Sequence, residues 1–132
     1  MSTPTSPVTG VDFVVVPTKD IDTAVDFYGN VLGLRESARY GRAPGVEFET
    51  GSLTLAVLQS DGFGMTYAPN KNPIALRVDD VAAARADLES RGVEFVPEPI
   101  DSGVCHMTFF HDPDGNALML HHRYAPREES GG

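Results

Sequence analysis

The side chains that could serve as nucleophiles, acid–base groups or soft metal ligands lie close together near the end of this sequence. The chain has one cysteine and four histidines, and these are Cys105, His106, His111, His121 and His122. Cys105 and His106 are neighbours in a strand-like run, so they point to opposite faces and form no Cys–His nucleophilic pair without another partner. We therefore expect Cys105 to be a small buried apolar residue and His122 to be a structural histidine.

The segment His111–Asn116, HDPDGN, combines a histidine with two carboxylates in a short stretch. Such a cluster could hold an ion, but the geometry of a turn explains both aspartates. The Asp112 carboxylate can cap the turn, Pro113 presets φ at the first corner, and Gly115 supplies a position of positive φ. The sequence therefore predicts a hairpin here rather than an ion site.

The elements around these residues occur twice in the chain. In each half a β-branched run is followed by an aspartate that can cap a helix, by apolar residues at helical spacing, and by a closing glycine. The matching segments are Val11–Val16, Asp20 and Gly33 in the first half, and Ile74–Val78, Asp80 and Gly92 in the second. Further strand-like runs cover 34–40, 46–50, 52–58, 93–98, 105–111 and 117–123. Each half thus has the order β-α-β-β-β, which predicts an α+β fold of two βαβββ modules.

One such module could hardly bury its own sheet face, so the two modules are expected to share a core in one domain. The predicted boundaries are 8–124 for the domain, about 8–60 and 73–124 for the modules, 59–72 for the linker, and 1–7 and 125–132 for flexible polar tails.

The composition excludes several classes of partner. A net charge of −9 argues against nucleic acid and anionic membranes, because both require a basic surface. The single cysteine excludes an internal disulfide, and the sequence contains no signal peptide and no long apolar run. We therefore expect a soluble cytoplasmic protein.

Three separated motifs resemble the vicinal oxygen chelate superfamily, which includes glyoxalase I, extradiol dioxygenases, and fosfomycin and bleomycin resistance proteins. The motifs are DIDTAVDFY at 20–28 with VLGL at 31–34, VDDV at 78–81, and FHDPDGN at 110–116. They occur in the family's order, and the resemblance covers about residues 8–124. It implies that the two modules build a glyoxalase-like incomplete barrel, or cup, and that the protein is a homodimer.

The resemblance also implies four positions for metal ligands, one on the first strand and one on the last strand of each module. Counting from the capping aspartates and the turn glycines, these positions are Phe13, Leu55, Pro73 and Met119. None of the four offers the nitrogen or oxygen ligands that such metals need. We therefore expect no metal and no other cofactor in the cup.

Strand alternation predicts which side chains line the concave face of the cup. The expected apolar residues are Phe13, Val15, Leu53, Leu55, Val57, Ala75, Met107, Phe109 and Met119. Arg77 and His121 should join them and suit a carboxylate or phosphate on a ligand. The alternative is that Arg77 pairs with an internal acid, Glu47 or Glu49, and that His121 lies at the solvent rim.

The linker carries Phe63, Met65 and Tyr67 among glycines, which favours either a lid over the pocket or a dimer contact. Two classes of function remain. The first is a metal-free protein that binds a small organic molecule, for which an acidic surface suits a cationic drug. The second is an enzyme, either a metal-dependent lyase or dioxygenase, or a metal-free variant that uses Arg77, His121 or a tyrosine.

Overall fold

The computed structural model describes residues 6–126, and most of both predicted tails lies outside them. The first module contains β1 (Val14–Thr18), α1 (Ile21–Val25), its π-helical continuation η1 (Asp26–Val31), β2 (Arg35–Arg39), β3 (Gly45–Glu49) and β4 (Thr54–Gln59). The linker contains the short 3₁₀ helix η2 (Ser60–Phe63). The second module contains β5 (Ile74–Arg77), α2 (Val81–Ser90), β6 (Ile100–Asp101), β7 (Cys105–His111) and β8 (Ala117–Arg123).

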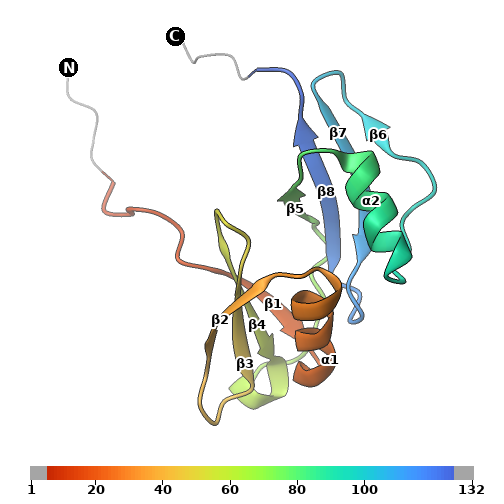
Figure 1. Ribbon diagram of the computed structural model, residues 1–132. Coiled ribbons are helices and arrows are strands. Elements are labelled where there is room, and N and C mark those ends of the chain that lie inside the picture. The colour runs from red at the N-terminus through yellow and green to blue at the C-terminus, as the bar shows by residue number, and fades with distance from the viewer. Residues whose placement is uncertain (1–5, 127–132) are drawn as a thin grey trace, which may run out of the picture.

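The strands form two four-stranded sheets of the same topology (Figure 1). Their orders are β1-β4-β3-β2 and β5-β8-β7-β6. In each sheet the first strand pairs in parallel with the last, and the other pairs are antiparallel. The predicted pair of βαβββ modules is therefore confirmed, and β1 and β5 are corresponding edge strands.

The two helices begin where the aspartates predicted them. The Asp20 carboxylate accepts from the backbone N–H of Asp22 at 3.0 Å, and the Asp80 carboxylate accepts from that of Ala83 at 3.0 Å. These bonds satisfy amides that the first helical turn leaves free. Helix α1 packs on β4, and α2 packs on β7 and β8, so one face of each sheet is covered by a helix. We call the other face of each sheet its open face.

The two modules share one hydrophobic core. It joins Tyr28 and Phe48 of the first module to Phe110, Leu118 and Leu120 of the second. The rings of Tyr28 and Phe48 lie 6.1 Å apart between centroids. Because buried residues of both modules belong to one cluster, this shared core fixes how the modules meet.

The first strand begins at Val14, later than the predicted run from Val11, and the strand predicted over 93–98 is placed wrongly. In this segment Phe95 forms only an isolated bridge with Phe110, and strand β6 starts later, at Ile100. Pro97 and Pro99 lack the N–H that an antiparallel ladder needs, so they delay regular pairing. Neither helix in the described part of the chain is long and apolar enough to cross a membrane.

Candidate functional site

The register of the second sheet brings the predicted residues of that module onto its open face. Ala75 pairs with Met119 and Arg77 with His121 across β5 and β8. Met107 lies opposite His121, and Phe109 lies opposite Met119, across β7 and β8. Since alternate residues of a strand share a face, these six side chains form one patch on the side away from α2.

The register of the first sheet corrects the prediction for β4. Leu55 pairs with Val14 and Val57 with Val16, and all four side chains pack in the core on the helix side. The prediction rests on aligning the turn glycines Gly51 and Gly115. In the structure, the residue that pairs with the edge strand is Ala56, five positions after Gly51, but Met119, four positions after Gly115. Ala56, which pairs with Val15, therefore lies on the open face where Leu55 was expected.

Leu53 also leaves the predicted face. It precedes β4, is partly buried, and lines a groove between the modules.

With this register, the four implied ligand positions have no side chain suited to a divalent metal. They are now Phe13 and Pro73, which lie just before the two edge strands, and Ala56 and Met119 on the paired strands. Three of these side chains are hydrocarbon, and the thioether of Met119 suits soft Cu(I) rather than the divalent ions of such sites. Among residues 6–126, no group of three or more His, Cys, Asp or Glu side chains is placed to hold a metal.

Large apolar side chains on the open faces contact solvent in the single chain. Phe13 is 46% exposed and Val15 is 37% exposed beside the first sheet, and Ile100 is 48% exposed on the second. Met107, Phe109 and Met119 are only partly buried. Exposed apolar surface of this kind marks a site of association or ligand binding.

The open face of the first module also carries a hydrogen-bonded acid. The Tyr40 hydroxyl donates to the Glu47 carboxylate, and the Tyr40 ring lies where a Cβ on Gly45 would stand. Burial, followed by the hydrogen bond and charge of Glu47, raises the pKa of Tyr40 to about 12. Glu49 accepts instead from Ser37 and Thr54, so both acids proposed as partners of Arg77 are engaged elsewhere.

Tyr67 is fixed by contacts with both modules. Its hydroxyl donates to the backbone carbonyl of Asp114 at 2.6 Å, and Lys19 stands over its ring at 5.1 Å. Phe63 packs edge-on against Tyr40 with 6.5 Å between ring centroids. This part of the linker is therefore fastened to both modules rather than poised as a lid.

The HDPDGN turn forms a polar contact between the modules, which we call the clamp (Asp112, Asp114 and Asn116 with Pro17, Thr18 and Tyr28). Asp112 is only 5% exposed. Its carboxylate accepts from the Tyr28 hydroxyl at 2.7 Å, from the Asn116 side-chain amide at 2.8 Å, and from the backbone N–H groups of Asp114 and Asn116. These donors offset the cost of burying the carboxylate.

The remaining members of the clamp reach the end of β1. The Asn116 side chain donates to the carbonyl of Pro17 at 2.7 Å, and the Thr18 hydroxyl donates to the Asp114 carboxylate at 2.5 Å. Burial, then the charge and hydrogen bond of Asp112, holds the pKa of Tyr28 far above its usual range. The phenol therefore stays a neutral donor, and the clamp ties the second module to the first.

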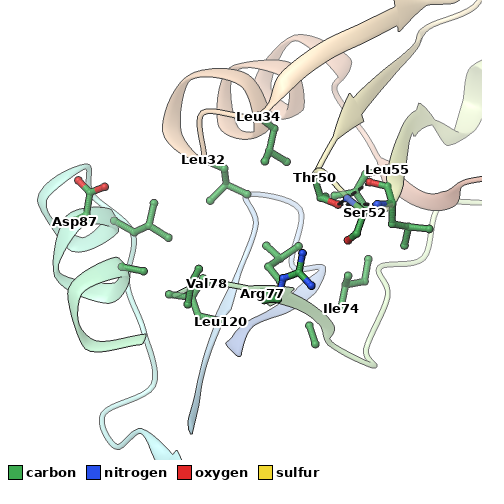
Figure 2. Close-up of a pocket in the computed structure, with 15 residues that line it drawn as sticks. Leu32, Leu34, Thr50, Ser52, Leu55, Ile74, Arg77, Val78, Asp87 and Leu120 are labelled. Carbon is green, nitrogen blue, oxygen red and sulfur yellow. Dashed lines mark hydrogen bonds between the residues drawn. The ribbon is translucent and has the colours of Figure 1, made fainter. Parts of the chain in front are cut away.

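A groove lies where the β3–β4 turn of the first module meets the second module (Figure 2). It has a volume of about 370 Å³. Its lining is mostly aliphatic and comprises Leu32, Leu34, Leu53, Leu55, Ile74, Ala75, Leu76, Val78, Ala84, Leu88 and Leu120, with Thr50, Ser52, Arg77 and Asp87 as polar members.

Arg77 is the cation of this groove. Figure 2 shows its guanidinium projecting from β5 toward the first module. No ion pair within residues 6–126 includes Arg77. Because β5 is an edge strand, a long side chain on its open face can also reach round the edge into the groove. The predicted pairing of Arg77 with Glu47 or Glu49 is thus absent.

The remaining histidines have different surroundings. His122 Nδ1 lies 3.1 Å from the carbonyl of Val78 on the helix side of the sheet, as expected of a structural histidine. His106 contacts Asp101 at 3.4 Å and stacks on Tyr124. Cys105 is buried, as predicted.

Two features were missed from the sequence. The clamp was interpreted as turn chemistry alone, although DPDGN together with a helical Tyr28 offers matching acceptor and donor groups. The groove gives no signal in any single segment. The one relevant feature of the sequence is that the β3–β4 turn has smaller side chains than the HDPDGN turn. Smaller side chains fill less of the space between the modules at that contact.

Comparison with known proteins identifies the fold and its relatives. Residues 10–120 match the model of the Glyoxalase/Bleomycin resistance protein/Dioxygenase superfamily. TnmS3, an antibiotic binding protein from Streptomyces sp. CB03234, is 26% identical with a TM-score of 0.73, over 88% of this chain and 97% of its own. A glyoxalase/bleomycin resistance protein from the same strain is 27% identical with a TM-score of 0.71, over 86% and 100%. A superfamily member from Sphaerobacter thermophilus is 26% identical with a TM-score of 0.74, over 86% and 96%.

Proposed function

Because the chain belongs to the Glyoxalase/Bleomycin resistance protein/Dioxygenase superfamily, we propose that it binds a small organic molecule on its open faces without a catalytic metal. One observation carries this proposal. The positions at which the family resemblance implies metal ligands hold Phe13, Ala56, Pro73 and Met119, which lack the required nitrogen and oxygen atoms. The similarity to an antibiotic binding protein supports binding rather than metal-assisted catalysis.

The chemistry of the open faces supports an amphipathic ligand. The second module offers Met107, Phe109 and Met119 around His121, and methionine side chains adapt to varied apolar shapes. The first module offers Val15 and the acid Glu47 on either side of Ala56, and Glu47 is held by Tyr40. An apolar surface with a few fixed polar groups is typical of small-molecule sites.

We propose further that a second copy of the chain completes the site. The open faces expose Val15 and Ile100 in the single chain, and pairing two copies would remove this apolar surface from water. In such a dimer, the open face of a module in one chain and the open face of a module in the other chain enclose the ligand.

The first experiment measures metal content and ligand binding on the same purified protein. We expect no stoichiometric divalent metal after dialysis, by elemental mass spectrometry, and saturable fluorescence enhancement of the apolar dye anilinonaphthalenesulfonate. Met119→Glu should weaken dye binding on the open face, because it places a carboxylate on the apolar patch, without creating a metal site. The matched control, Ala83→Glu on the exposed side of α2, should bind like the wild type. Stoichiometric Ni, Zn, Mn or Fe at Met119 and its neighbours would contradict the proposal.

The second experiment measures mass in solution by light scattering. We expect twice the 14.2 kDa of one chain. The double variant Val15→Lys, Ile100→Lys places charges on both open faces and should shift the mass to that of a monomer. Lysines at two exposed helix positions, Ala83→Lys and Ala86→Lys, should leave the mass unchanged. A monomeric wild-type protein would refute the second-copy part of the proposal.

A further inference from the structure

We propose that the groove between the modules is a second binding site, which differs from the open faces in its leucine walls although Ala75 and Arg77 of the edge strand β5 border both, and that it takes a small carboxylate with an aliphatic body. The groove is lined by leucine side chains from both modules and has one guanidinium, that of Arg77, at its edge (Figure 2). This site goes beyond the proposed binding on the open faces and does not depend on it.

The walls of the groove come from elements that the shared core holds in place. Leu32 and Leu34 follow the first helix, Leu53 enters β4, and Leu88 and Leu120 belong to α2 and β8. Leu88 and Leu120 are themselves part of the shared core. Its volume of about 370 Å³ falls in the lower part of the range for small-molecule pockets, which is roughly 300–1,000 Å³.

The internal repeat explains why space remains at this place. Counting from the capping residues Asp20 and Asp80, Leu88 in α2 corresponds to Tyr28 in the first helix. Around Tyr28, the HDPDGN turn fills the contact with the side chains of Asp112 and Asn116. Around Leu88, the smaller β3–β4 turn brings no such group. The corresponding volume is therefore left as an apolar groove.

The polar groups of the groove select an anion. Asp87 is bound by Arg91 at 3.0 Å, and the Thr50 hydroxyl donates to the carbonyl of Leu53 at 2.7 Å. Arg77 has no ion-pair partner among the residues that the structure describes. A guanidinium beside an apolar cavity is best satisfied by a carboxylate, which it can bind through two parallel hydrogen bonds.

The occupant is accordingly an aliphatic carboxylate, and the probe is octanoate, with octanol as its neutral counterpart. Binding is followed by methyl NMR on the full chain. The methyl groups of Leu53, Leu88 and Leu120 report on the groove, and those of Met107 and Met119 report on the open face. We expect octanoate to shift the leucine signals saturably and to leave the methionine signals in place. Octanol should bind about 10- to 100-fold more weakly, since it lacks the charge-assisted bonds.

Two variants test the groove itself. Arg77→Gln should weaken octanoate binding to about the level of octanol. Ala84→Leu adds volume inside the groove from α2 and should abolish octanoate binding, while leucine keeps the helix stable. The matched control is Ala83→Leu, one residue earlier on the exposed side of α2, which should bind octanoate like the wild type.

Several results would overturn the groove site. Shifts confined to Met107 and Met119 would place octanoate on the open face, which supports the proposed function and removes the second site. Equal binding of octanoate and octanol, or full binding by folded Ala84→Leu, would contradict the role of Arg77 or of the groove. Leucine shifts that change with protein concentration, and that octanoate leaves unaltered, would show that a second copy fills the groove instead.

Discussion

The two contacts between the modules are related by the internal repeat, yet one consists of hydrogen-bonded polar side chains and the other of aliphatic side chains. At one contact the clamp fills the space with side-chain hydrogen bonds around the buried carboxylate of Asp112. At the other, the β3–β4 turn leaves the groove, which is lined by leucines and by Arg77, a cation without an ion-pair partner among residues 6–126. The difference suggests that one copy of a repeated contact holds the modules together and that the other is free to bind.

This division follows from a few residues. Tyr28 and Leu88 occupy equivalent helix positions, but only the phenol can donate to a buried carboxylate. Asn116 and Ser52 each follow a turn glycine of positive φ, Gly115 or Gly51. Only the longer Asn116 side chain reaches the carbonyl of the neighbouring edge strand, at Pro17. A clamp needs both a helical donor such as Tyr28 and a long turn side chain such as Asn116. The second contact has neither, so no clamp forms there.

The largest effect should come from removing the centre of the clamp. Asp112→Ala removes the acceptor of the Tyr28 hydroxyl, one of the two acceptors of the Asn116 side-chain amide, and the acceptor of two backbone N–H groups. Because each unsatisfied buried group costs about 1–3 kcal/mol, we expect a loss of about 3–5 kcal/mol in the free energy of unfolding. Urea denaturation followed by circular dichroism measures it.

The control for this variant is Asp12→Ala, which removes an exposed carboxylate before β1. It should change the free energy of unfolding by less than about 0.5 kcal/mol. Similar losses for both variants would mean that the clamp does not hold the modules together.

The regular elements could be predicted because their signals are local. Asp20 and Asp80 cap their helices as expected, and the order β-α-β-β-β appears in both modules. The delayed start of β6 differs from the prediction because the apolar pattern of 93–98 favours a strand, whereas Pro97 and Pro99 lack the N–H groups that regular pairing needs.

The site was harder to predict because it depends on register and on contacts between distant segments. The face of Leu55 was predicted wrongly because aligning Gly51 with Gly115 places β4 out of register by one residue. A one-residue shift of register moves every side chain of a strand to the opposite face of the sheet. Arg77 pairs with His121 across β5 and β8, but its position on an edge strand also opens it to the groove. The clamp joins residues such as Tyr28 and Asp112, which are 84 positions apart, and no local pattern links them.

The second prediction exchanges corresponding residues of the two turns. Asn116→Ser removes three hydrogen bonds, to Pro17, to Asp112 and from the backbone N–H of Asn70. It should cost about 2–3 kcal/mol in the free energy of unfolding. The reverse change, Ser52→Asn, finds no buried acceptor at Leu88 and should stay within about 0.5 kcal/mol. Thermal and urea unfolding measure both. A large gain from Ser52→Asn would show that the groove side conceals a clamp after all.

The smallest effect concerns the phenol of Tyr28 and its dependence on pH. Tyr28→Phe removes one of several donors to Asp112 and should cost about 1–2 kcal/mol at neutral pH. In an Asp112→Asn background, the same substitution should reduce the free energy of unfolding by much less, because the effects of substitutions at contacting residues are not additive.

The phenol of Tyr28 also makes the stability that the clamp contributes depend on pH in the alkaline range. Burial and Asp112 raise the pKa of Tyr28 above its usual value, so the unfolded chain releases this proton first. The stabilisation is then complete below the unfolded pKa of about 10 and is lost as the pH rises above it, by about 1.4 kcal/mol per pH unit for each such group. Tyr40, whose pKa is raised to about 12, adds to the loss between these values. Tyr28→Phe should therefore unfold with a shallower pH dependence above about pH 10, measured by urea titrations across that range. An unchanged slope would mean that Tyr28 ionises equally well in the folded protein, and that the clamp does not depend on a neutral donor at this position.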